Sequence, residues 1–194
     1  MTENEFILFD RLEVIRNTIN KYGEENFYIS FSGGKDSTVL HYIIDEALPN
    51  NKIPRVYINT GIEYNDILKF VKQMQKSDNR IQIVNSNVHI PSMLKQKGYP
   101  FKSKEHAHKL SIYQNSGMTK AVDRYVKGLR NDDTLSKFSC PKSLLYQFTD
   151  DFELKVSEKC CDELKKKTVH RYEKQSRRTV AIIGLRTAEG GGES

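Results

Sequence analysis

The sequence lacks several features that would point to other classes of protein. Its 194 residues contain no tryptophan, five prolines and three cysteines, and so few cysteines exclude the disulfide framework of a small secreted domain. No apolar run approaches the roughly 18 residues that cross a bilayer. The N-terminal stretch carries acidic residues where a signal peptide has basic ones. We therefore expect a cytoplasmic protein that does not span a membrane.

Positive charge is what the chain has in excess. The formal net charge is +6, and most of it comes from the segment 155–178, which holds nine Lys/Arg and four Asp/Glu. A local basic patch indicates a polyanion as partner, such as a nucleotide phosphate, a sulfate or RNA. The alternative interpretation is a solvated helix face, which charged runs often form.

Hydrophobic periodicity organises the first half of the chain. A helix is expected at 4–22, and strands are expected at 27–31, 54–60 and 80–86, with amphipathic helices between the strands. Such alternation predicts a parallel sheet with right-handed crossovers and helices on both faces. The length suits a single domain that covers 1–194.

The second half is more polar and more helical. The pattern from about 91 to 130 is helical, with Ser103 suited to cap one helix. An irregular stretch follows, then a helix at 157–175 and a last buried strand at 179–184. The expected fold class is therefore a three-layer α/β protein with a parallel sheet and helical C-terminal additions.

A glycine-rich hexapeptide lies between the first expected strand and the helix after it, and reads Ser32-Gly33-Gly34-Lys35-Asp36-Ser37. Its glycines can adopt backbone angles closed to other residues, the helix N-terminus favours an anion, and Lys35 adds a cation. These features predict a phosphate cradle. Asp36 is suited to hold Mg²⁺ that bridges phosphate oxygens. A Walker A loop is excluded, because Asp36 stands where that motif has Ser or Thr.

The hexapeptide resembles the PP-loop of the N-type ATP pyrophosphatases and of the phosphoadenylyl-sulfate (PAPS) reductase family. The six residues from Asn59 to Tyr64, N-T-G-I-E-Y, resemble that family's D-T-G-x-E-Y segment, with Asn in place of Asp. Further likenesses follow in the family's order: Gly98-Tyr99-Pro100 with Ser103-Lys104-Glu105, Glu158-Lys159-Cys160-Cys161 with Lys165-Lys166-Lys167, and Gly184-Leu185-Arg186 with Glu193-Ser194. The resemblance implies an adenine nucleotide α-hydrolase-like fold, which is related to the Rossmann fold.

The resemblance also implies which residues form the site. Nucleotide contacts are expected from Ser32, Gly33, Gly34, Lys35, Asp36, Ser37, Asn59, Thr60, Gly61 and Lys104. Among these, Lys35 and Asp36 are the expected catalytic residues, with Asp36 as the Mg²⁺ ligand. Lys104 and the basic residues of 165–178 are candidates for a second anionic group. An independent rule agrees, because open parallel sheets bind ligands at the carboxyl ends of their strands.

The implied activity is that of an enzyme acting at the sulfate or phosphate end of PAPS, adenylyl sulfate or ATP. A reductase of this family would also need a thioredoxin-like reductant. One alternative is a Mg²⁺-dependent ATP pyrophosphatase that adenylates a substrate for sulfur transfer to RNA or DNA, with the basic segment holding nucleic acid. Another alternative is a non-catalytic homologue that binds nucleotide without turnover.

The cysteines bear on these alternatives. In iron–sulfur relatives a Cys-Cys pair such as Cys160-Cys161 supplies two ligands to a [4Fe–4S] cluster, which needs four thiolates. Here the remaining cysteine is Cys140, upstream, so inert or redox-sensitive thiols are the preferred interpretation, and a zinc site is a further alternative. The family's reductases use a cysteine on a C-terminal tail, and none follows Cys161. We therefore expect either a truncated chain or the loss of that step.

Overall fold

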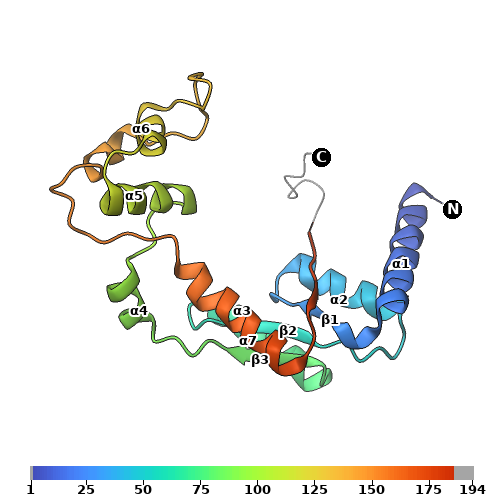
Figure 1. The fold of residues 1–194 in the computed structure, drawn as a ribbon. Helices are drawn as coiled ribbons and strands as arrows, with labels where there is room; N and C mark the ends of the chain where they lie inside the picture. The colour runs from blue at the N-terminus through green and yellow to red at the C-terminus, as the bar shows by residue number, and fades with distance from the viewer. Residues whose placement is uncertain (1, 186–194) are drawn as a thin grey trace. The chain divides into compact units, whose positions relative to one another are not determined.

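A computed structural model of the chain describes residues 2–185 (Figure 1). The chain divides into two compact units, which are described separately. Unit 1 consists of Met1–Asn87 and Lys165–Ser194, and unit 2 of Val88–Leu164. The predicted single nucleotide-binding domain over 1–194 stays a prediction.

Unit 1 is built on an all-parallel sheet of four strands in the spatial order β3-β2-β1-β4. Its strands are β1 (Phe27–Ser30), β2 (Arg55–Asn59), β3 (Ile81–Asn85) and β4 (Val180–Ile182). Ile29 of β1 is the register partner of Arg55 in β2, which in turn pairs with Ile81 in β3. The first three strands fall within the segments expected from the sequence, and the α/β fold class is confirmed.

Alternate residues of these strands point to opposite faces of the sheet. On one face Ile29 and Tyr57 pack in apolar clusters with residues of three helices. On the other face Tyr28 and Val56 pack against Tyr172 of a fourth helix. The sheet is thus covered on both faces, which gives three layers. The helices are α1 (Glu3–Tyr22), α2 (Lys35–Ala47) and α3 (Asn65–Ser77) on the first face, and α7 (Lys167–Ser176) on the second.

The last strand, β4, differs from the buried strand expected at 179–184. It forms, and Val180 pairs with Phe27 of β1, but the predicted burial was wrong because Val180 is 41% exposed. β4 has three residues and, among the strands of residues 2–185, it lies at the edge of the sheet beside β1 alone. An apolar run in sequence does not distinguish such an edge strand from a central one.

Unit 2 is helical. Its helices are α4 (Ile90–Lys97), α5 (Lys104–Ser116) and α6 (Lys120–Lys127), followed by the short 3-10 helix η2 (Lys142–Gln147). Ser103 caps α5, because its side chain accepts a hydrogen bond from the amide of His106. The core of the unit gathers Leu110, Val122 and Phe148. The π-helical turn η3 (Asp162–Lys166) leads from this unit into α7. Among residues 2–185, no helix has both the length and the apolar character needed to cross a bilayer.

A buried ion network lies at the amino ends of β2 and β3. Arg55 is fully buried, and its guanidinium donates to Nδ1 of His41 at 3.0 Å and to Asp45 Oδ1 at 2.6 Å. Arg80 donates to the same Asp45 carboxylate at 2.7 Å and to Asp78 at 2.8 Å. The two arginines thus neutralise the two carboxylates. His41, Asp45 and Asp78 lie close enough together to share a metal ion, but a cation would have to displace these arginines.

This network predicts that the fold loses stability in acid. Burial, followed by the charge of Arg55, lowers the pKa of His41 below its ordinary value. Burial is the largest effect and acts to raise the pKa of Asp45 and Asp78, but hydrogen bonds from Arg80 and other neighbours, together with the charges of Arg55 and Arg80, lower the pKa of both. Because each group binds protons more weakly in the folded state, the unfolded state takes up more protons as pH falls. The free energy of unfolding should decrease below about pH 6.5 through His41, and again below about pH 4 through the two carboxylates.

Urea unfolding at a series of pH values measures this dependence. A His41→Gln variant, which cannot titrate there, should lose the decrease between pH 6.5 and 5 and keep the one below pH 4. An equal decrease in both proteins between pH 6.5 and 5 would contradict the assignment to His41.

Candidate nucleotide site

The loop after β1 is held in shape by its own serines. Ser37 is buried, and its hydroxyl donates to the carbonyl of Gly34 at 3.0 Å. The same oxygen accepts from the amide of Ser32 at 3.2 Å and lies 2.9 Å from the Ser32 hydroxyl. Ser37 therefore closes the loop, and its direct contact with a ligand stays a prediction.

Gly33 occupies a position where a side chain does not fit. Its φ is +71°, and a Cβ there would lie 2.8 Å from Cγ2 of Val71 and 3.0 Å from Cγ2 of Ile67, both on α3. The loop backbone thus lies directly on α3. This close approach explains why glycine is needed, and it fixes the place of the loop at the carboxyl edge of the sheet.

The loop runs into the N-terminus of α2. Gly34 is the N-cap and provides no side-chain cap, while the first-turn amides of a helix have no carbonyl partners within it. Lys35, the first helical residue, is exposed, and Asp36 follows in the first turn. Backbone amides, a helix dipole and a lysine together favour an anion. A carboxylate beside them is a suitable Mg²⁺ ligand, because Mg²⁺ is usually held by one or two carboxylates and by substrate phosphates.

The loop after β2 forms a second polar group at the same edge. The side-chain nitrogen of Asn59 donates to Oδ1 of Asn85 at 2.8 Å, and the side-chain oxygen of Asn59 accepts from the backbone amide of Gly61 at 3.2 Å. The Glu63 carboxylate accepts from the Thr60 hydroxyl at 2.6 Å and from the Thr60 and Gly61 amides. Burial acts to raise the pKa of Glu63, but these hydrogen bonds lower it below its usual value. The Glu63 carboxylate is therefore ionised, and its hydrogen bonds hold the loop after β2 in shape.

Two further segments of unit 1 reach this edge. Arg171 of α7 donates from Nη2 to the carbonyl of Asn85, the last residue of β3, at 2.6 Å. Gly184, after β4, lies against the first turn of α2, since a Cβ on it would be 2.9 Å from the carbonyl oxygen of Asp36. Sequence reasoning overlooked Asn85, although a polar residue at the carboxyl end of a parallel strand was a usable signal.

The predicted site residues are divided between the two units. Unit 1 brings together Ser32 to Ser37 and Asn59 to Gly61, whereas Lys104 begins α5 in unit 2 and is exposed. The role of Lys104 in the site stays a prediction. The resemblance at Arg186 and at Glu193-Ser194 lies outside the described residues.

The three cysteines lie in different surroundings within unit 2. Cys140 is buried in the apolar core of unit 2, and burial raises the pKa of its thiol. Cys160 is half-buried and Cys161 is exposed. Within residues 2–185, no group of three metal-binding side chains close enough to share an ion includes a cysteine. The [4Fe–4S] cluster, which needs four thiolates, stays a prediction.

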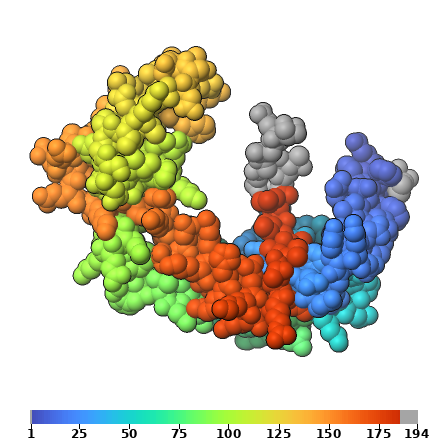
Figure 2. Space-filling view, viewed as in Figure 1, coloured from blue at the N-terminus to red at the C-terminus, as the bar shows by residue number. Residues whose placement is uncertain are grey.

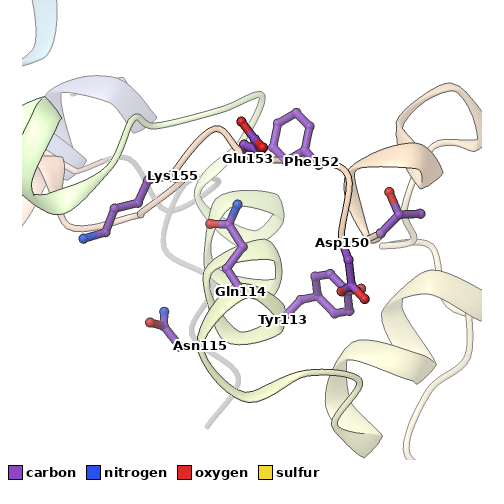
Figure 3. Close-up of a pocket in the computed structure, with 8 residues that line it drawn as sticks. Tyr113, Gln114, Asn115, Asp150, Phe152, Glu153 and Lys155 are labelled. Carbon is purple, nitrogen blue, oxygen red and sulfur yellow. The ribbon is translucent and has the colours of Figure 1, made fainter.

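Unit 2 has a hollow of its own (Figure 3). Its volume is about 380 Å³. The side-chain amide of Gln114 forms hydrogen bonds with main-chain atoms on both sides. Its nitrogen donates to the carbonyl of Leu154, and its oxygen accepts from the amide of Val156. Tyr113 donates to Asp150 at 3.2 Å. These polar groups hold the segment at 150–156 in place, which accounts for them without a ligand.

Comparisons with known proteins agree with this geometry. The model of the phosphoadenosine phosphosulfate reductase domain matches residues 26–143, which is more than half of the chain. An uncharacterized protein of Methanocaldococcus jannaschii is 31% identical over 103 residues, covering 48% of this chain and 25% of that protein. The chain thus spans about a quarter of that relative's length. No solved structure matches the chain.

The matched segment begins just before β1 and contains both loops of the candidate site. The order of elements agrees with it, since the hexapeptide follows the first strand and opens α2 in an all-parallel sheet. The chain therefore belongs to the phosphoadenosine phosphosulfate reductase family, within the PP-loop adenine nucleotide α-hydrolase-like superfamily.

Proposed function

We propose that the protein is an enzyme that binds an adenosine nucleotide at the carboxyl edge of the unit 1 sheet and acts at its sulfate or phosphate end. The observation that carries the proposal is the loop between Phe31 and α2. Its backbone passes so close to α3 that Gly33 has no room for a side chain, and it ends at an uncapped helix N-terminus that carries Lys35. Both features support the proposal of an anion site at this loop.

Each group would have a distinct part in the reaction. The loop amides and Lys35 would hold the terminal anion and stabilise the charge that develops on it as it leaves. Asn59, Thr60 and Gly61 would lie beside the adenosine. Arg171 would offer its remaining N–H donors to a second anionic group at the end of β3. A family reductase would further require an external thiol reductant of the thioredoxin class.

Asp36 favours a second candidate within the same site. Its carboxylate is suited to hold Mg²⁺, which when bound would offset the charge of nucleotide phosphates. With ATP as substrate, pyrophosphate would then be the leaving group and an acceptor oxygen would be adenylated. A requirement for Mg²⁺ in nucleotide binding would favour this candidate over sulfonucleotide reduction.

Substitution of Lys35 tests the proposed site. A hydrogen bond to a charged group contributes about 1.5–3 kcal/mol, so Lys35→Ala should weaken binding of the nucleotide about 10- to 100-fold. The measurement is isothermal titration calorimetry with adenylyl sulfate, phosphoadenylyl sulfate and Mg·ATP. Lys72→Ala, an exposed lysine in the middle of α3, is the matched control. Equal affinities in the two variants would show that the anion does not bind at the loop.

A further inference from the structure

The N-terminal half of α1 is apolar and only partly covered by the rest of unit 1. Its apolar side chains that are between 39% and 58% exposed, here called the α1 patch, are Phe6, Ile7, Leu8, Phe9 and Val14. In the described part of the chain, the apolar cluster that joins α1 to the sheet uses Ile15 and Ile19, nearer the end of the helix. Figure 2 shows the N-terminal turns of α1, in dark blue, projecting from unit 1.

The helical repeat explains why the sheet cannot cover this patch. Successive residues of an α-helix are about 100° apart around its axis, so the four consecutive apolar residues from Phe6 to Phe9 point in four directions. A sheet that packs against one side of α1 can bury only part of such a turn. Helices that are apolar all round are normally buried on every side. The sequence of α1 therefore suits a helix that a second body covers.

The α1 patch is large enough for a specific interface of modest strength. A buried phenylalanine side chain accounts for about 150–250 Å², so the partly exposed residues of the patch present about 400 Å² of apolar surface. Two copies of the patch placed face to face would bury about 800 Å² of apolar area and, because interfaces are about 60% apolar, about 1,300 Å² in total. That total lies at the small end of the range for specific protein–protein interfaces.

The charges at the two ends of α1 favour a second copy of the same helix as the partner. Glu3 and Glu5 lie in the first turn and Lys21 lies in the last turn, and all three are exposed. Glu5 also accepts a hydrogen bond from the Thr2 amide, and the ammonium of Lys21 lies 5.1 Å from the centre of the Tyr22 ring. Neither of these neighbours carries an opposite charge, so the helix has an acidic start and a basic end.

The charges between the ends are paired within the helix itself. Asp10 contacts Arg11 at 2.9 Å, and Glu13 contacts Arg16. An antiparallel pair of α1 helices would therefore bring the acidic start of each helix to the basic end of the other, and would also align their dipoles favourably. A parallel pair would bring like charges together. The helix is thus complementary to itself in one orientation, which a twofold axis satisfies.

We propose that the α1 patch is a self-association surface, through which two copies of the chain pair their α1 helices in antiparallel orientation. An anionic membrane is the less suitable partner, because helices that bind membrane surfaces carry Lys and Arg on their polar face, whereas residues 3–13 contain four acids and one base. The proposal does not depend on the nucleotide site, because none of the predicted site residues belongs to α1.

Sedimentation velocity of the full chain tests this surface. An interface of this size is expected to dissociate at micromolar concentrations, so the wild type should convert from monomer to dimer between about 1 and 200 μM. The variant Phe6→Gln/Phe9→Gln places good helix formers at both positions and removes four phenylalanine side chains from one dimer. Its dissociation constant should be at least about 100-fold higher than that of the wild type.

The matched control changes two exposed apolar residues with the same spacing on another helix. Val39 is 48% exposed and Tyr42 is 61% exposed on α2, and the variant Val39→Gln/Tyr42→Gln should keep the wild-type dissociation constant. As monomers, the α1 variant and the wild type should melt within a few degrees of each other. Three results would overturn the proposal: a wild type that stays monomeric at every concentration, equal losses in the two double variants, or tighter binding of the wild type to phosphatidylcholine vesicles than to itself.

Discussion

Gly33→Ala is expected to lower the free energy of unfolding by about 2–5 kcal/mol and to abolish measurable nucleotide binding. A left-handed backbone costs an L-residue about 1–2 kcal/mol, and crowding in a packed region typically costs about 1–3 kcal/mol more. The added Cβ would lie 2.8 Å from Val71 and 3.0 Å from Ile67. Relief of that overlap has to move the loop away from α3, and the movement would displace the amides that face the anion.

The neighbouring glycine provides the control. Gly34 has an ordinary extended backbone, with φ at −84°, and a Cβ there would meet the Ser32 hydroxyl at 3.3 Å. Gly34→Ala should therefore change the stability by less than about 1 kcal/mol. Both variants are compared by urea unfolding and calorimetric titration. If Gly33→Ala were as stable as Gly34→Ala, the described contact between the loop and α3 would be wrong.

Arg55→Met is expected to destabilise the protein by about 3–5 kcal/mol, because it leaves two carboxylates of the network with one arginine between them and removes the donor to His41 and Asn51. The guanidinium is fully buried and donates to His41, Asn51 and Asp45. For a chain of this length the melting temperature should fall by about 6–20 °C. Nucleotide affinity below the new transition should be unchanged, because the network lies at the amino ends of β2 and β3.

An exposed ion pair provides the comparison for this variant. Lys69 contacts Asp66 at 3.0 Å with both side chains largely exposed, and Lys69→Met should cost no more than about 1 kcal/mol. Differential scanning calorimetry of the two variants measures the contrast. Similar melting temperatures would mean that Arg55 is not held in the interior as described.

The first half of the fold could be predicted because local patterns and tertiary structure agree there. The aromatic and β-branched residues of β1, the glycine pair after it and the apolar stripe of α2 all indicate the same strand–loop–helix unit. Ser103 was recognised as a helix cap because its hydrogen bond to His106 is local in sequence. In such segments the residues that determine the structure are neighbours in the chain.

Other features depend on contacts between residues far apart in sequence, so sequence patterns could not reveal them. Position 33 requires glycine because Val71 leaves no room for a side chain. Arg171 is held by the carbonyl of Asn85, and Arg55 is buried with a hydrogen-bond partner on α2. The sequence also did not reveal that the Ser37 hydroxyl donates to the carbonyl of Gly34. A hydrogen-bonding side chain shows its capacity in the sequence but not its partner.

The departure at Asn59 illustrates how sequence and structure complement each other. The family segment that this loop resembles begins with Asp, and the sequence shows only that Asn replaces it. In the structure the Asn59 amide group both donates and accepts, joining Asn85 to the backbone of Gly61. An Asp could accept from Gly61 but could not donate to Asn85. The substitution is therefore accommodated by a partner on the adjacent strand.

The measurement that most directly tests the account is a thermal-shift titration of the wild-type protein with adenosine nucleotides. The panel comprises adenylyl sulfate, phosphoadenylyl sulfate, and ATP with and without Mg²⁺, with GTP as the control. At about 100 times its dissociation constant a bound nucleotide should stabilise the fold by about 2.7 kcal/mol, which raises the melting temperature by several degrees. The account predicts such a shift with at least one adenosine nucleotide and none with GTP. No shift with any adenosine nucleotide at millimolar concentration would contradict it.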